Sequence, residues 1–352
     1  MGVGGLTKVT LLQVWDISKY LGQYYVEPEP QPEPVIDYSL LPLFIENLTD
    51  NQETIMLRRK SMSGDTITVE YSYDNNEWFT GYTGDNGTNI SLPGYSRVYL
   101  RSNVSAWSEA GGKDHYIDAD SVNGRFAVGG NILSLTYGSA FNGQQTFKNN
   151  TSATFASIFR NFETLVSAEN LIIPCADNER CYYRTFEGCT SLEIAPKLLG
   201  GALGEECYRS MFNGCTSLIT ANVIEATTCD TDSCYRMFAG CTSLVNVPSV
   251  LSAIVGYSCY REMYTGCTSL TTAPVLPRAI LAGYSYYRMF EGCSSLKNVT
   301  CLATYGITFN HNTDYWMSGV AANGTFTKDA EAVQWYRDMS GIPATWTVVD
   351  YQ

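Results

Sequence analysis

The sequence predicts a mixed α/β protein whose centre is a repeat solenoid, preceded by a β-sandwich and an N-terminal anchor helix. Three observations predict this class: a phrase that recurs every 26 residues, short alternating strands before it, and an apolar helical pattern at the N-terminus. The predicted divisions are 1–35 for the anchor helix and a spacer, 36–138 for the β-sandwich, 139–300 for the solenoid and 301–352 for a C-terminal cap.

The repeat is marked by cysteines within the phrases FEGCTSL, FNGCTSL, FAGCTSL, YTGCTSL and FEGCSSL. Apolar or small residues lie eight, seven, four and three positions before each cysteine, which is typical of one face of a short helix. A glycine can then close the helix, and a strand follows a turn. Each coil must stack on the next to bury its apolar face. The marker cysteines are Cys189, Cys215, Cys241, Cys267 and Cys293, and Phe159, Phe162 and Leu165 indicate a degenerate first coil.

The phrase FxGCTSL, with CYRSMF before it and LTTAPVLP after it, resembles the BspA-like (Treponema-type) leucine-rich repeats over residues 155–300. Such repeats are common in surface proteins of gut Bacteroidales bacteria and in their phages. The resemblance implies a leucine-rich-repeat solenoid, surface display and binding, and it carries over no catalytic residue. The chain departs from the pattern at Ser233 and Ser285, where a cysteine is expected.

Composition limits the partners and the cofactors. Charged residues make up 16% of the chain and the net charge is −13, which argues against nucleic acid and anionic membranes as partners. Most of the twelve cysteines occupy repeat positions, so we expect buried free thiols rather than disulfides. Because no C-x-x-C pair exists, we expect neither a metal site nor a cofactor.

The N-terminal segment is interpreted as an attachment module. An amphipathic helix over 6–21 either packs on its own domain or docks on another virion protein, and docking is favoured because alternating prolines at 27–34 form an extended spacer. The segment has no secretory signal, lipobox or membrane span, which favours a phage particle over a cell envelope unless a leader has been trimmed. The predicted docking residues are Leu6, Val9, Leu12, Trp15 and Leu21.

The regions that flank the repeats read as β-structure. Turn signals between short alternating runs favour a sandwich of immunoglobulin-like size, and residues 118–124 are interpreted as a turn rather than a calcium loop. In the cap we expect strands over 324–328 and 346–350, with a short helix near 329–338 between them. The predicted strands of the sandwich are 43–47, 54–59, 66–73, 78–80, 89–92, 97–102, 125–128 and 132–135.

No catalytic arrangement is visible, so we predict that the protein is not an enzyme. Only two histidines exist, and neither lies in a nucleophile or phosphate-binding motif. Two surfaces repeat instead: a nearly uncharged strand face after each leucine, and outward positions that align into a ladder of tyrosine and arginine. This ladder either binds a ligand or is only a solvated helix face. Its residues are Tyr183, Arg184, Arg209, Tyr235, Arg236, Arg261, Tyr287 and Arg288.

The predicted function is that of a structural virion protein of a bacteriophage, a head or tail fibre or decoration subunit at the virion surface. Its N-terminus would bind other virion proteins, and its repeats would bind host-surface polysaccharide or protein. We expect a homo-oligomer, with a trimer favoured, because weak repeated contacts need multivalency. The alternatives are a bacterial cell-surface adhesin and a glycan-degrading enzyme.

Overall fold

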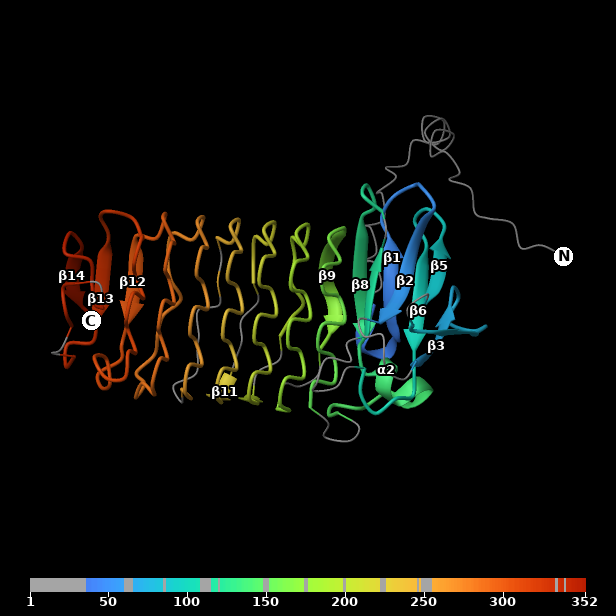
Figure 1. The fold of residues 1–352 in the computed structure, drawn as a ribbon, viewed down its shortest axis with the longest axis horizontal. Coiled ribbons are helices and arrows are strands. Elements are labelled where there is room, and N and C mark those ends of the chain that lie inside the picture. Colours follow the sequence, from blue (N-terminus) through green and yellow to red (C-terminus); the bar gives the residue numbers. More distant parts are fainter. Residues whose placement is uncertain are drawn as a thin grey trace, which may run out of the picture. The chain divides into compact units, whose positions relative to one another are not determined.

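The computed structural model describes residues 36–59, 66–84, 87–107, 115–119, 121–147, 152–173, 177–198, 201–221, 226–245, 247, 255–332, 335–338 and 340–352. The chain divides into two compact units, Met1–Asp37 and Tyr38–Gln352, and the second holds every described helix and strand (Figure 1). The predicted anchor helix, its spacer and the five predicted docking residues lie outside the described residues.

Two sheets form the N-terminal part of the second unit. All neighbouring strands in them are antiparallel except β8 and β9, which run parallel. The larger sheet has the order β4 (Phe79–Tyr82), β3 (Thr68–Ser72), β6 (Arg97–Arg101), β1 (Leu43–Asn47), β8 (Phe126–Asn131) and β9 (Leu165–Ile172). The smaller sheet has the order β5 (Thr88–Leu92), β2 (Glu53–Arg59) and β7 (His115–Ala119).

The alternating pattern located most of these strands. The predictions over 43–102 and 125–128 coincide with β1 to β6 and β8 to within a few residues, whereas β7 was missed. The strand predicted over 132–135 is wrong, because Ser134–Tyr137 form the short helix α2. The hydroxyl of Ser134 accepts a bond from the Leu43 N–H and donates one to the Leu100 carbonyl, so this segment closes the end of the sheet.

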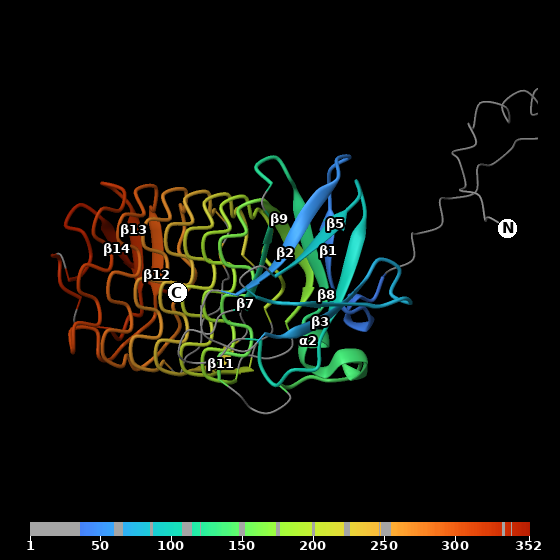
Figure 2. The same ribbon diagram turned by 45° about the vertical axis from the view of Figure 1, so that its right-hand side comes forward.

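From residue 152 onward the chain forms coils that stack side by side (Figures 1 and 2). Before each marker cysteine, every second N–H donates to the next coil: Tyr182 N–H lies 3.0 Å from the Cys207 carbonyl oxygen, and Phe186 N–H lies 2.8 Å from that of Met211. The N–H groups between them close four-residue turns by donating to the third preceding carbonyl, as Thr185 N–H does to the Tyr182 carbonyl oxygen at 3.3 Å. An α-helix needs bonds to the fourth preceding residue, so these segments are turns.

The reason is the period of the apolar pattern. Apolar residues lie eight and four positions before the cysteine and at the cysteine itself, and a second set lies seven and three positions before it. Both sets repeat every four residues, whereas an α-helix repeats every 3.6. The backbone follows the same period, because Arg180, Arg184 and Gly188 all take left-handed conformations, with φ of 55°, 56° and 77°. A ribbon of turns with this period directs half of its N–H groups sideways, toward the neighbouring coil.

The predicted fold class, a mixed α/β leucine-rich-repeat solenoid with an anchor helix, is therefore wrong. The described chain is built of strands and turns, and its helical structure is α2 with two 3₁₀ turns, η1 (Tyr38–Leu40) and η2 (Gly138–Ala140). The first region also differs from the predicted immunoglobulin-like sandwich, because β9 of the repeat region joins its larger sheet in parallel.

Stacked rings form the core of the coils. One column contains an aromatic ring three residues before each marker cysteine, with neighbouring centroids 5.4–5.6 Å apart. Rings stacked in this offset manner add dispersion and quadrupole attraction to the burial of their apolar area. The eleven cysteines of the described chain are all buried and free, as predicted. The rings of this column are those of Phe159, Phe186, Phe212, Phe238, Tyr264 and Phe290.

Both ends of the stack are covered. The first coil bonds to the smaller sheet through Ile117 N–H and the Ile158 carbonyl oxygen, 2.7 Å apart. At the other end β12 (Asn298–Cys301), β13 (Thr325–Lys328) and β14 (Thr347–Asp350) form a parallel sheet, which confirms the two predicted cap strands. The helix predicted over 329–338 is absent from the part of that range that is described. A short pair, β10 (Gly201–Leu203) and β11 (Ala226–Cys229), lies within the stack.

Candidate ligand-binding face

The turns before the marker cysteines bring tyrosine and arginine into one alternating column. Arg209 lies between two rings, with its Cζ 5.9 Å from the centroid of Tyr183 and 4.7 Å from that of Tyr235. Arg261 repeats the arrangement, at 5.2 Å from Tyr235 and 5.0 Å from Tyr287. Each such cation–π contact contributes about 0.5–1 kcal/mol at an exposed site.

A second column of arginines covers the same rings from the side. Arg184 lies 4.7 Å from the Tyr183 centroid, and Arg288 lies 5.2 Å from that of Tyr287. Arg236 occupies the same place at Tyr235, at 5.4 Å. The left-handed turn at each of these arginines places it beside the preceding tyrosine. All eight predicted ladder residues therefore lie on one surface, which we call the Tyr/Arg face, although that surface is a turn ribbon and not the predicted helix.

Buried acids hold the guanidinium groups in place. Arg209 Nη1 lies 2.8 Å from Glu206 Oε1, and Arg236 Nη2 lies 2.6 Å from Glu262 Oε2. Glu206 and Glu262 are only 8% and 5% exposed. Burial by itself would raise the pKa of Glu206, but its bonds with Arg180 and Arg209 outweigh burial and lower that pKa. The face is thus nearly charge-balanced, and its arginines are bound both to acids and to tyrosine rings.

The face continues into a group of aromatic rings that the sequence reading missed. Tyr284 is its centre, with ring centroids 5.6 Å from Tyr257, 5.6 Å from Tyr287 and 5.2 Å from His311. Tyr287 in turn contacts Tyr315 at 6.5 Å. Tyr257 is 50% exposed and Tyr315 37% exposed, so these rings are accessible. We call these five residues the aromatic group.

A signal for this group was present in the sequence. Nine residues before the marker cysteine, the earlier coils carry polar residues, whereas the last carries Tyr284. The earlier residues are Arg180, Glu206, Asp232 and Ser258. His311 and Tyr315 belong to a further coil without a cysteine, which was assigned to the cap. Its left-handed residues at 311, 315 and 319 keep the period of four.

The histidines have structural partners. The imidazole of His115 lies in the core, with Nδ1 2.6 Å from Thr83 Oγ1. His311 Nδ1 lies 2.6 Å from Asp314 Oδ2, and its ring stacks on Tyr284.

The predicted strand face is a second repeated surface. Parallel bridges align Ile194 with Ser167 on one side and with Thr220 on the other. Ile194 and its neighbour in the next coil, Ile219, are 41% and 47% exposed. At its described positions, this face consists of aliphatic, polar and charged residues and has no aromatic ring.

No protein family, curated protein or solved structure matches the chain. None of the described helices is long and apolar enough to cross a membrane.

Proposed function

We propose that this protein is a structural virion protein of a bacteriophage, a fibre or decoration subunit, whose Tyr/Arg face binds host-surface carbohydrate. The observation that carries the binding proposal is the continuity of the Tyr/Arg face with the exposed aromatic group. Monomeric proteins rarely expose clustered rings without a partner, and tyrosine and arginine are enriched where proteins make contacts.

Carbohydrate suits this face better than a charged polymer does. The arginines are already paired with acids, and the chain carries a net charge of −13, so a polyanion would gain little. A tyrosine recurs at every second coil, and the core rings of neighbouring coils have centroids 5.4 Å apart, so the exposed rings are regularly spaced. A regular row of rings suits a polymer of repeating sugar units, and tyrosine offers both a ring face and a hydroxyl.

The assignment to a virion rests on the resemblance of the repeats and on residues 1–35. Reduced, buried thiols suit a protein that assembles in a reducing cytoplasm. Each sugar contact is weak, so a trimeric fibre or many copies on one particle would supply avidity. A bacterial cell-surface adhesin would use the same face; a signal or lipobox encoded upstream would identify it.

The binding test replaces Tyr183, Tyr235 and Tyr287 with alanine. At about 1 kcal/mol for each ring, binding to host polysaccharide should weaken roughly 100-fold. The matched control replaces three exposed tyrosines outside the face, Tyr82→Ala, Tyr95→Ala and Tyr351→Ala, and should bind as the parent does. Equal binding by both triple variants would refute the proposal, and cleavage of the polysaccharide would favour an enzyme.

The attachment test removes residues 1–35. Because the described elements all lie in a separate compact unit, the remaining chain should unfold at an unchanged temperature. It should nevertheless fail to join particles. Incorporation at the normal level would show that the segment is not the attachment module.

A further inference from the structure

Besides Ser233, one coil carries two cysteines at positions where its neighbouring coils carry larger apolar residues. Seven residues before each marker cysteine, buried aromatic rings stack from coil to coil with centroids 5.9–6.2 Å apart, but Cys234 takes the place of one ring. Twelve residues before the marker, the neighbouring coils carry Leu203 and Val255, whereas this coil carries Cys229. The stacked rings are those of Phe155, Tyr182, Tyr208, Tyr260, Tyr286 and Trp316.

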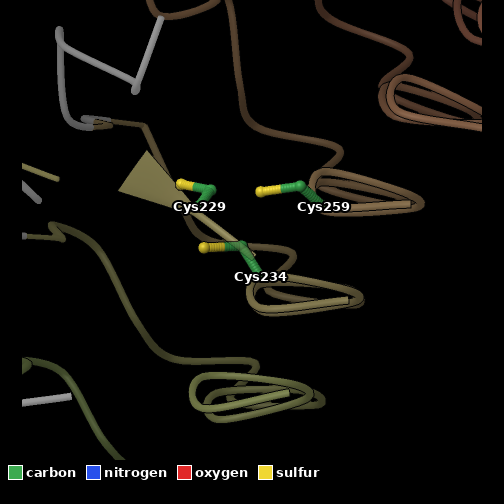
Figure 3. Close-up of side chains that lie close together, drawn as sticks. All are labelled: Cys229, Cys234 and Cys259. Carbon is green, nitrogen blue, oxygen red and sulfur yellow. The ribbon is translucent and has the colours of Figure 1, made fainter. Parts of the chain in front are cut away.

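The two exceptional cysteines meet a third from the next coil. The Sγ atoms of Cys229, Cys234 and Cys259 all lie within 4.8 Å of one another, and all three side chains are buried (Figure 3). Cys229 ends strand β11, and Cys234 lies in the turn that follows it. The nearest hydroxyls are that of Tyr260, 3.1 Å from Cys229 Sγ, and that of Ser233, 3.4 Å from Cys259 Sγ.

This cluster differs from the other core thiols. Cys215 and Cys241, for example, each donate S–H to a carbonyl oxygen at 3.1 Å, and burial raises the pKa of both thiols. In the cluster, hydrogen bonds from Cys234 and Cys259 lower the pKa of Cys229. The bond with Cys229, together with burial, raises the pKa of Cys234, and burial, together with the bond to Cys229, raises the pKa of Cys259. The three sulfur atoms of the cluster therefore face one another instead of separate carbonyl groups, and sulfur ligands gathered in this way suit a thiophilic metal ion.

We propose that Cys229, Cys234 and Cys259 bind one closed-shell thiophilic metal ion, Cu⁺ or Zn²⁺, in a buried site that links two adjacent coils. Metal–sulfur bonds of about 2.3 Å in a plane require sulfur atoms about 4 Å apart, which the cluster reaches with small shifts. Thiolate ligands select Cu⁺ and Zn²⁺ over hard cations. Three thiolates suffice for Cu⁺, whereas a tetrahedral Zn²⁺ ion would need a fourth ligand besides the three sulfur atoms.

Binding of the metal ion would replace the hydrogen bonds among the three thiols with metal–sulfur bonds. Each thiol that becomes a ligand releases its proton to solvent, so the affinity should rise with pH. The ion would fill the position that an aromatic ring occupies in the neighbouring coils, and would stabilise the folded chain in proportion to its occupancy. This inference is independent of the proposed carbohydrate binding.

The test titrates the reduced full-length protein with Zn²⁺ and, separately, with Cu⁺ against a chromophoric chelator. One equivalent of at least one ion should bind, and the unfolding temperature should rise with it. Cys259→Ser should weaken binding roughly tenfold or more. Cys181→Ser is the matched control, because it makes the same change in the same column, where Ser233 and Ser285 occur naturally, and it should bind as the parent does.

A second variant separates loss of the site from loss of the fold. Cys234→Tyr restores the ring that the other coils carry, so it should fold and yet fail to bind. The relative affinities for the two ions identify which one the site prefers. The proposal is overturned if neither ion binds stoichiometrically, if Cys259→Ser binds as Cys181→Ser does, or if mass spectrometry finds a disulfide within the cluster.

Discussion

The marker cysteine of each coil is a small apolar residue that also satisfies a carbonyl group. Cys189 Sγ lies 3.0 Å from the Phe159 carbonyl oxygen, and Cys293 Sγ lies 3.1 Å from that of Tyr264. Each of these bonds joins one coil to the preceding one. The Phe159 and Tyr264 carbonyl oxygens also accept the backbone N–H groups of Phe162 and Cys267, at 3.2 and 3.1 Å, so the S–H group satisfies the second lone pair of each oxygen.

The first prediction concerns the pH dependence of stability. Burial raises the pKa of Cys293 from its ordinary value of 9.0 to about 12. Below pH 9 the thiol is neutral in both states, and its contribution to stability is complete. Between pH 9 and 12 only the unfolded chain ionises, so the free energy of unfolding should fall by about 1.4 kcal/mol per pH unit for this group.

Urea unfolding of the parent and of Cys293→Ser over this pH range measures the effect. Serine does not ionise there, so the slope of the variant should be smaller by the contribution of one group. Identical slopes would mean that this thiol ionises equally in both states.

At the scale of the element, the turn ribbon depends on left-handed residues at every fourth position. Gly214 has φ of 77°, and an added Cβ would lie 3.9 Å from Gly188 Cα, which is an ordinary contact. The position therefore tests the backbone conformation alone, without a steric clash.

Gly214→Ala should lower the free energy of unfolding by about 1–2 kcal/mol, because a Cβ disfavours this conformation. The exposed Glu205→Ala in the same coil is the control and should change stability by less than roughly 0.5 kcal/mol. The urea midpoints of both variants provide the measurement. Equal midpoints would contradict the turn assignment.

The Tyr/Arg face makes a prediction about its central ring. Tyr235 lies within 5.4 Å of three guanidinium carbons, those of Arg209, Arg236 and Arg261. Tyr235→Ala should lower the free energy of unfolding by about 1–2 kcal/mol or more. Tyr235→Phe keeps the ring face and should lower the free energy of unfolding by less than about 0.5 kcal/mol. Thermal unfolding of the two variants distinguishes them, and an equal loss in both would assign the effect to the hydroxyl.

For the whole molecule, the ends of the stack decide whether the coils remain soluble. The indole of Trp346 is 2% exposed, and its N–H lies 2.9 Å from the Ala321 carbonyl oxygen. Strands β13 and β14 thereby cover the edge of β12 and the last coil. An uncovered strand edge is a template for association with other chains.

Removal of residues 324–352 should therefore lower the unfolding temperature and cause self-association. Light scattering and calorimetry of the truncated chain measure both effects. Alanine at Tyr351, an exposed residue of the same segment, serves as the control and should have no effect. A monomeric truncated chain of unchanged stability would show that the cap is dispensable.

The sequence by itself determined the repeats and most of the strands of the first region, because a fixed 26-residue phrase and a two-residue alternation are visible without any tertiary information. It also placed Tyr183, Tyr235 and Tyr287 in one column, because identical coils align identical positions. The two cap strands over 324–328 and 346–350 were also predicted from the sequence, but their parallel pairing was not.

Only the tertiary structure decided between helix and turn. An apolar period of four lies close to that of a helix, and the choice depends on N–H groups that find acceptors such as Cys207 in another coil. The parallel joining of β8 to β9 required two segments distant in sequence to meet. The cluster of Cys229, Cys234 and Cys259 required the same, because only stacking brings the third sulfur from the next coil beside the first two.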